Sequence, residues 1–373
     1  MKDTIIIGGG LAGLVSSIEL ARNGFDVTVI EKKTYPFHRV CGEYISNEVK
    51  KYIGSLGLDL NALGVSDINR FQFSSPSGRV LETKLDLGGF GISRYLLDFE
   101  LFKIAQKTGV QFILNQTVEN VEPILEQNKM SITLSDGQIL ESKIVLGAYG
   151  KSAKLDKTLQ RDFVQKKSPY IGVKHHIRTD FPKDLIALHN FEDGYCGISA
   201  IEDDKHCLCY LTTREQLRRF GNIAEMEKEV LCKNPHLNQI FGNAEFLYDR
   251  PEVINEFSFA PKTAIENHVL MVGDAAGLIT PLCGNGMAMA IHGGKIASEL
   301  STKFLKNEIS RVVLEQKYQQ VWKQQFGQRL WIGRNVQRLF GDVWLSELAL
   351  SFFKLSPSLL NLVVKSTHGE VVL

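Results

Sequence analysis

Two short apolar runs near the start of the chain enclose a segment with helical spacing. The first run is Thr4–Ile7, and the second is Phe25–Ile30. Between them, Leu11–Arg22 carries apolar residues three and four positions apart, and Asn23-Gly24 supplies a stop signal. Short continuous apolar runs are typical of strands buried in a parallel sheet. The pattern therefore predicts a strand, a helix and a second parallel strand.

Three glycines lie where the first predicted strand meets the first predicted helix. Gly8, Gly10 and Gly13 form the pattern G-x-G-x-x-G. They allow a tight turn, a close approach of backbone to a diphosphate and close helix–strand packing, while the helix N-terminus offers N–H groups to the phosphates. Glu31 follows the second strand, where a carboxylate binds the hydroxyls of an adenosine ribose and disfavours a 2′-phosphate. These residues predict a dinucleotide site.

The middle of the chain changes to patterns typical of antiparallel sheet. Arg94–Lys107 is predicted as a helix, and Asp136-Gly137 as a hairpin turn between short strands. The apolar run Lys143–Leu146 is predicted as a further, separate strand. Residues 168–262 then carry mostly strand-like runs, with a single helix predicted near 223–232. We therefore expect a second sheet between the two ends of the chain.

A second strand–turn–helix pattern follows this region. The apolar run His268–Val272 leads into Gly273-Asp274, and the glycine-rich turn Pro281–Met287 opens a predicted helix at 286–305. An aspartate after such a strand can accept a hydrogen bond from a flavin ribityl hydroxyl. N–H groups at the helix start can stabilise negative charge on a reduced flavin. Together with the first motif, this pattern predicts FAD.

The order of these segments predicts a discontinuous cofactor domain. We expect an α/β fold with a Rossmann-type (GR2-like) FAD-binding domain, an inserted, mainly antiparallel β-sheet domain for the substrate, and a helical C-terminal tail. The flavin should lie at the domain interface, where pockets tend to form. The expected bounds are 1–67, 93–165 and 263–305 for the FAD-binding domain, 68–92 and 166–262 for the sheet domain, and 306–373 for the tail.

Charge and cysteine content narrow the class of protein. The chain has 43 Lys and Arg against 42 Asp and Glu, so no net field favours nucleic acid. None of the six cysteines forms C-x-x-C, and no Cys/His cluster has zinc spacing, which predicts reduced thiols in a cytoplasmic protein and no metal. The chain runs almost directly into the strand Thr4–Ile7 without a basic region, so we expect no signal peptide. The apolar stretch Val343–Val364 is broken by Pro357. We expect it to form a core or cover helix, for example over the substrate pocket; pairing with another subunit and peripheral membrane contact are the less favoured alternatives.

Two pairs of residues on predicted strands receive structural interpretations. His175 and His176 should point to opposite faces of their strand, and the sequence places no carboxylate at ligand spacing from them. Cys207 and Cys209 should share one face, which we interpret as a packed face of the sheet, not a metal site.

Four stretches resemble the flavoprotein group that includes para-hydroxybenzoate hydroxylase, geranylgeranyl reductases and flavin-dependent halogenases. They are Gly8–Gly13 with Glu31, Phe37–Glu43, Ile92–Asp98 and Gly273–Met287. The resemblance covers most of the chain. It implies that Arg94 lies near the FAD, that Asp274 contacts the ribityl chain, and that the loop 281–287 lies beside the isoalloxazine. The pair Cys41-Gly42 is most similar to geranylgeranyl reductases and makes Cys41 a candidate active-site thiol, with a buried packing role as the alternative.

The chain departs from the patterns of this group in three places. Tyr149-Gly150 stands where many hydroxylases have Asp-Gly, which leaves room for a separate reductase partner as electron donor. The tryptophans lack the spacing of the halogenase motif. Residues 194–199 lack the aromatic motif of prenyl reductases.

We therefore predict an enzyme with non-covalent FAD, NAD(P)H or another reductant, and an apolar or aromatic small-molecule substrate. A flavin monooxygenase that hydroxylates or epoxidises is favoured because such enzymes are common in this group. The alternatives are a C=C reductase of an isoprenoid or polyketide, and a non-catalytic flavin electron carrier. Cys41 is the candidate catalytic residue. The predicted cofactor contacts are Gly8, Gly10, Leu11, Ala12, Gly13, Glu31, Lys32, Arg39, Cys41, Gly42, Arg94, Val118, Gly273, Asp274, Pro281, Gly284, Asn285, Gly286 and Met287.

Overall fold

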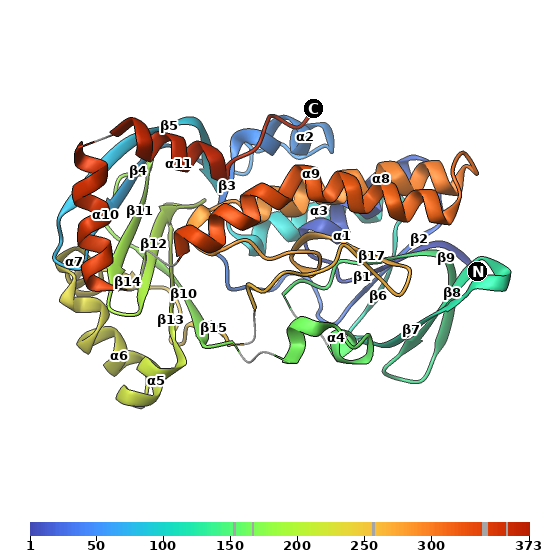
Figure 1. The fold of residues 1–373 in the computed structure, drawn as a ribbon, viewed down its shortest axis with the longest axis horizontal. Helices are drawn as coiled ribbons and strands as arrows, with labels where there is room; N and C mark the ends of the chain where they lie inside the picture. The colour runs from blue at the N-terminus through green and yellow to red at the C-terminus, as the bar shows by residue number, and fades with distance from the viewer. Residues whose placement is uncertain (152–153, 166–167, 256–257, 338–341, 356) are drawn as a thin grey trace.

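Two β-sheets lie side by side along the long axis of the molecule (Figure 1). The computed structural model describes residues 1–151, 154–165, 168–255, 258–337, 342–355 and 357–373. Sheet A has a parallel centre, whereas sheet B is mainly antiparallel. The predicted α/β fold with a second, antiparallel sheet is confirmed.

Sheet A contains the first strand of the chain, β1. Its central strands pair in the order β17-β9-β1-β2-β6. Ile5 and Ile6 point to opposite faces and are both fully buried, as the apolar run predicted. Residues 139–142 pair antiparallel with β8, and residues 142–147 pair parallel with β1. The two separate strands that the sequence predicted here therefore form one continuous strand, β9. The strands are β1 (Lys2–Ile7), β2 (Val27–Glu31), β6 (Gln111–Leu114), β7 (Val118–Ile124), β8 (Lys129–Leu134), β9 (Ile139–Gly147), β16 (Ile265–Glu266) and β17 (Val269–Met271).

Glycines allow three helices to stack closely beside sheet A. A Cβ on Gly294 would lie 2.9 Å from the carbonyl oxygen of Ala12, and one on Gly293 would lie 3.0 Å from the Trp322 ring. The helices α1, α8 and α9 therefore approach one another at these glycines. The helices of this half are α1 (Leu11–Arg22), α2 (Lys50–Ser55), α3 (Arg94–Lys107), α4 (Lys154–Thr158), α8 (Gly286–Leu305) and α9 (Arg311–Gln337), and α1, α3 and α8 have the predicted bounds.

Sheet B has the order β14-β10-β13-β12-β11-β4-β5-β3. Tyr44–Ser46, which the sequence assigned to the FAD-binding segments, pairs with β5 in this sheet. The strands are β3 (Tyr44–Ser46), β4 (Ser66–Ser74), β5 (Val80–Gly91), β10 (Tyr170–Arg178), β11 (Leu185–Phe191), β12 (Gly194–Ala200), β13 (His206–Thr213), β14 (Glu245–Phe246) and β15 (Glu252–Ile254).

Three short helices cover the outer face of sheet B. They are α5 (Arg214–Phe220), α6 (Ile223–Glu229) and α7 (Pro235–Asn243), of which the sequence predicted only the second. The side chains of Ile198, Leu208 and Tyr210 pack against them. The opposite face of the sheet turns toward the segment 40–43, and the candidate site lies there.

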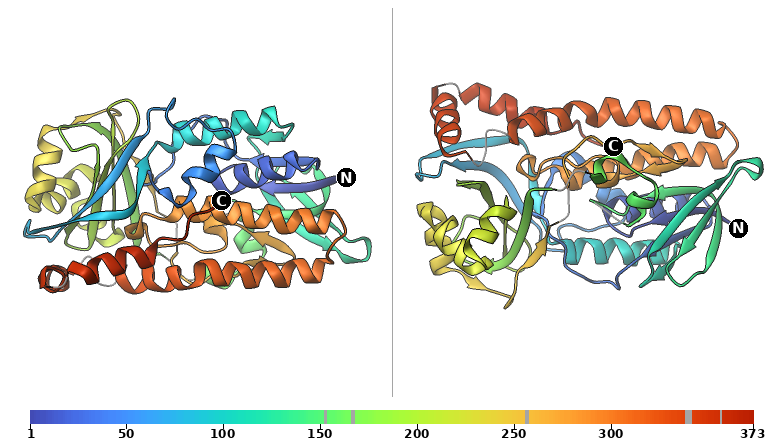
Figure 2. Two further views of the ribbon diagram at one scale, coloured as in Figure 1. Left: turned by 90° about the horizontal axis from the view of Figure 1, so that it is seen from above. Right: turned by 60° about the horizontal axis from the view of Figure 1, so that its bottom comes forward.

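The C-terminal segment returns along both sheets. Helix α9 runs from sheet A toward sheet B, where α10 (Val343–Leu355) and α11 (Pro357–Thr367) follow it (Figure 2). Buried Glu48 anchors the end of the chain, because it accepts a hydrogen bond from Arg329 Nη1 at 3.1 Å and another from the Gly369 N–H. Among the described residues, no helix is both long and apolar enough to cross a bilayer.

Candidate active site

The turn between β1 and α1 has a shape that only glycine fits. Gly8 has a φ of +102°, and a Cβ there would lie 2.6 Å from the carbonyl oxygen of Ala148. A Cβ on Gly13 would lie 2.0 Å from the carbonyl oxygen of Gly8. Since the N-cap is Gly10, no side chain caps the first N–H groups of α1. These N–H groups are what a diphosphate requires.

Glu31 is held beside this turn at the end of β2. Its Oε2 accepts the Gly9 N–H at 2.9 Å, and its Oε1 accepts the Lys33 N–H at 3.1 Å. Arg39 Nη2 lies 3.3 Å from Oε2. An ionised carboxylate has about four lone-pair sites, so Glu31 keeps acceptor capacity for a sugar hydroxyl. Its position fits the predicted contact with an adenosine ribose.

Two arginines lie on the other side of the turn. Arg94 forms two hydrogen bonds with Asp98, of 2.7 and 2.8 Å, and Arg39 Nε lies 3.1 Å from the same carboxylate. A Cβ on Gly10 would lie 3.6 Å from Arg94 Nη2. Burial lowers the pKa of Arg94 and Asp98 raises it, with a net shift upward. A permanently charged guanidinium therefore lies where phosphate charge is expected.

The second glycine motif packs directly against the first. A Cβ on Gly273, whose φ is +63°, would lie 3.1 Å from the Ala12 side chain in α1. The carbonyl oxygen of Asp274 accepts a hydrogen bond from Lys262 Nζ at 2.9 Å. Burial lowers the pKa of Lys262 to about 8. A lysine that the sequence did not single out therefore lies beside the predicted ribityl contact.

The loop after this motif leads into α8. Gly284 has the left-handed φ of +61°, and the helix begins at Gly286. The side chain of Asn285 donates a hydrogen bond to the carbonyl oxygen of Thr367 at 2.8 Å. The amide of this predicted flavin contact thus binds the C-terminal segment, and its Oδ1 has no hydrogen-bond partner among the described residues. The loop backbone and the C-terminal segment are therefore positioned together.

Glu43, Lys174 and His176 form a buried acid–base cluster next to Cys41 and Gly42. Glu43 is fully buried and accepts hydrogen bonds from Lys174 Nζ at 2.9 Å and His176 Nε2 at 2.6 Å. Burial raises the pKa of Glu43, but Lys174 and His176 lower it more, to about 2. The pKa of Lys174 is raised, because Glu43 outweighs the effect of burial. Glu43 and Lys174 therefore form a buried ion pair.

The two histidines make buried polar contacts, which fits a role in the polar core. They lie on opposite faces of β10, as predicted, but each has a carboxylate partner. His175 Nε2 lies 2.8 Å from Glu227 Oε1, and His176 binds Glu43. These partners are 52 and 133 residues away along the chain, so no local spacing could reveal them.

Cys207 shares the face of His176, with its thiol directed at the carbonyl oxygen of Cys41 at 3.2 Å. Glu43, His176 and Cys207 each place one ligand atom within 4.8 Å of the others, which is close enough for a metal ion. However, the ammonium of Lys174 already compensates Glu43, and His176 Nε2 already binds it. We interpret Glu43 and His176 as a hydrogen-bonded pair beside the Cys207 thiol, and the absence of a metal stays a prediction.

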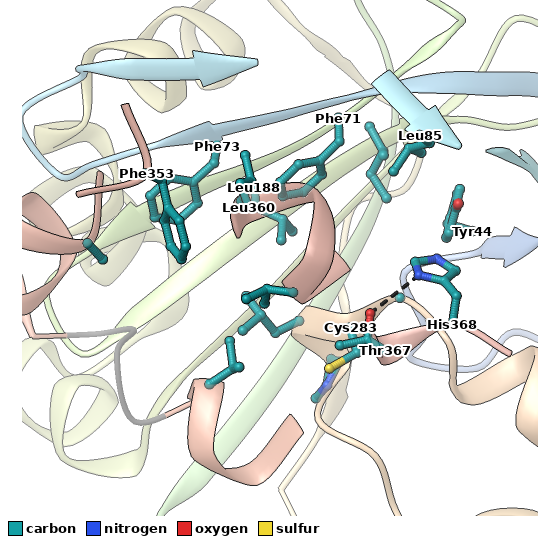
Figure 3. A pocket seen from close by; sticks show the side chains of 17 residues that line it. Tyr44, Phe71, Phe73, Leu85, Leu188, Cys283, Phe353, Leu360, Thr367 and His368 are labelled. Atoms are coloured by element: carbon teal, nitrogen blue, oxygen red, sulfur yellow. Dashed lines mark hydrogen bonds between the residues drawn. The ribbon is translucent and has the colours of Figure 1, made fainter. Parts of the chain in front are cut away.

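An apolar cavity of about 140 Å³ opens beside the loop 281–284 (Figure 3). Sheet B, this loop and the C-terminal helices form its walls. The Tyr44 ring packs beside Gly284, where a Cβ would lie 3.1 Å from it. The polar groups of Tyr44, Thr367 and His368 lie at one end. The apolar walls include Phe71, Phe73, Leu188, Cys283, Phe353 and Leu360.

The two glycine motifs lie against each other and lead to the cavity, an arrangement that suits a long dinucleotide cofactor. The first motif suits a diphosphate with its adenosine. The second motif packs against the first at Gly273 and reaches the cavity wall at residues 281–284. This fold and site define the FAD-dependent oxidoreductases. The chain belongs to the FAD binding domain family, whose model matches residues 1–304.

Known proteins similar to this chain include one receptor, one reductase and one brominase. Conditioned medium factor receptor 1 of Dictyostelium discoideum is 25% identical over 326 residues, 79% of this chain, which spans only 62% of that relative. Digeranylgeranylglycerophospholipid reductase of Methanosarcina acetivorans is 24% identical over 311 residues, 80% of this chain and 74% of that protein. The solved structure of the flavin-dependent brominase Bmp2 has a TM-score of 0.78 at 19% identity, over 98% of this chain and 93% of that one, and shows the shared fold.

The remaining predicted contacts lie at the two ends of the site. Lys32 is exposed directly after Glu31, and Val118 begins β7 just after Gln116, whose N–H donates to the Glu31 carbonyl at 3.3 Å. Met287 is buried in the first turn of α8. Their contacts with FAD stay predictions. The sequence missed Lys174, which lies directly before His175 in the predicted strand.

Proposed function

We propose that this chain is an FAD-dependent reductase that saturates a carbon–carbon double bond in a long apolar substrate of the isoprenoid type. The observation that carries the proposal is the cavity, whose walls are apolar except at the end with Tyr44 and His368. Such walls suit a hydrocarbon chain with at most one polar end. The similarity to the archaeal reductase supports the same substrate class.

Reduction of a double bond needs a hydride and a proton. Bound FAD, reduced by NAD(P)H or by a partner protein, supplies the hydride. The residues of the chain bind the apolar substrate, exclude water and hold the proton. Glu43 lies two residues after Cys41 in the chain, and its buried bonds to Lys174 and His176 hold the backbone that carries this candidate thiol. We also propose a cytoplasmic location, which the six free cysteines support.

The reaction can be tested with reduced enzyme under argon. Holoprotein reduced by dithionite is incubated with farnesol, and the products are analysed by mass spectrometry. The reductase is expected to add two hydrogen atoms per reduced double bond without any oxygen. Products that form only in air and that carry an added oxygen atom would overturn the proposal.

Filling the cavity should block the substrate without removing the cofactor. Ile186 lines the cavity from β11. We expect Ile186→Trp to lower kcat/KM for a long prenyl substrate by about tenfold or more, because the indole occupies the space that the hydrocarbon needs. FAD content should stay that of the wild type. Ile186→Leu, which conserves volume, is the control, and equal kcat/KM for both variants would contradict the role of the cavity.

Cys41 stays a candidate proton donor in the site. It is partly exposed, it lies two residues before Glu43, and its carbonyl oxygen accepts a hydrogen bond from the Cys207 thiol. If the thiol is catalytic, Cys41→Ser should slow turnover by about a hundredfold with normal FAD content. Cys232→Ser removes a comparable, partly exposed thiol from the helical side of sheet B and should leave the rate unchanged. Equal rates for the two variants would assign Cys41 to packing alone.

Monooxygenation, which the sequence favoured, is the second candidate. Phe71, Phe73 and Phe353 in the cavity walls also suit an aromatic ring, which supports a hydroxylase. The argon experiment separates the two reactions, because hydroxylation requires molecular oxygen.

A further inference from the structure

Helix α10 is apolar on two opposite faces. On the inner face, Ala349 and Phe353 line the cavity and Leu350 is fully buried. The outer face follows a spacing of four, four and three residues, which places its side chains in one stripe. A helix that only covers a core would carry polar residues there. The stripe consists of Trp344, Leu348, Phe352 and Leu355, which are 69%, 47%, 56% and 88% exposed.

We propose that this stripe docks on the surface of a lipid bilayer and that the substrate enters the cavity from there. The proposal rests on the proposed function, because only an apolar substrate dissolved in lipid needs such an entrance. The cavity lies on the opposite face of the same helix, where Phe353 directly follows Phe352 in the chain. A hydrocarbon chain that leaves the bilayer at the outer face of α10 therefore needs to pass only this helix to reach the cavity.

The charges at the C-terminal end of the stripe fit an anionic membrane surface. Lys354 lies at this end and is exposed in the last turn of α10, and Lys365 is exposed in the last turn of the following helix, α11. Lysines beside an apolar face favour anionic headgroups. Glu347 on the flank of α10 is paired with Arg79 Nη1 at 3.2 Å, so its charge is compensated.

The N-terminal end of the stripe, at Trp344, is acidic. Glu192, Asp193 and Asp342 line a polar pocket together with Trp344. We therefore place Leu348, Phe352 and Leu355 in the lipid. The acidic end stays in water, with Trp344 at the boundary, where tryptophan is favoured.

Sedimentation with vesicles tests the docking surface. Holoprotein is mixed with phosphatidylcholine vesicles that contain or lack phosphatidylglycerol, and wild type should bind the anionic vesicles more tightly. The double variant Phe352→Ser/Leu355→Ser should lose at least about tenfold in affinity, because it removes two large apolar side chains from the stripe. Val312→Ser, which removes a 62% exposed apolar residue from α9, should bind as wild type does.

Two further measurements separate this inference from the proposed function. With farnesol free in solution, the double variant should turn over as wild type does. With a long prenyl substrate embedded in vesicles, its KM should rise. If vesicle binding depends on the stripe but no prenyl substrate is reduced, the docking surface stands and the proposed function fails. Equal vesicle binding by wild type and double variant, or a stripe-dependent dimer that ignores vesicles, would overturn the docking surface.

Discussion

Replacing Gly13 with alanine is expected to abolish FAD binding. The new Cβ would lie 2.0 Å from the carbonyl oxygen of Gly8, which is backbone and cannot rotate away. Helix α1 must then shift relative to the turn, and its first N–H groups no longer meet the diphosphate in the required geometry. We expect the purified variant to contain less than about a tenth of the FAD of wild type, with overpacking strain of about 1–3 kcal/mol.

The measurement is visible absorbance of the purified protein, followed by titration with added FAD. Gly54→Ala is the matched control, because nothing lies within 4 Å of a Cβ at that glycine. The control should be as yellow as wild type. A Gly13→Ala protein with full FAD content would show that the turn does not hold the diphosphate.

Replacing Glu43 with glutamine is expected to lower the unfolding free energy more than any other single substitution proposed for this protein. Lys174 is only 2% exposed and Glu43 carries its compensating charge, so the variant leaves a buried ammonium unpaired. Breaking a buried ion pair in this way costs about 3–5 kcal/mol of unfolding free energy. Glu82→Gln, which breaks an ion pair of exposed residues with Arg70, should cost less than about 1 kcal/mol.

The stability that Glu43 contributes to the fold should decrease as the pH falls. Its pKa in the folded protein is about 2, below the usual 4.5, so the ionised carboxylate stabilises the fold fully above the usual pKa. This stability is lost as the pH falls toward the folded-state pKa. The difference in unfolding free energy between wild type and Glu43→Gln, measured by denaturant titration, should therefore shrink below about pH 4.5.

A second substitution distinguishes charge from packing at this position. Glu43→Gln/Lys174→Met removes both charges, so much of the lost stability should return. Equal stability of wild type and Glu43→Gln at neutral pH would mean that the pair contributes nothing to the fold.

The cofactor end of the site was predictable because its signals are local. The glycines of the first turn, Glu31 at the end of β2, and the bounds of α1 and α3 all follow from residues close together in the chain. A glycine without a Cβ and an apolar run have the same consequences in any tertiary context. The hairpin at Asp136-Gly137 was predictable for the same reason, and Gly137 has the expected positive φ.

The buried ion pair and the cavity were decided by tertiary structure. Glu43 meets Lys174 across 131 residues, and strand β3 joins sheet B although its neighbours in the chain lead to the cofactor domain. The cavity likewise combines sheet B, the loop 281–284 and the tail. The sequence by itself determined the glycine turn after β1 and the carboxylate at the end of β2, since each needs only a few consecutive residues. Only the folded chain decided which charges are buried together and which face of α10 stays exposed, because those contacts join segments that no local pattern connects.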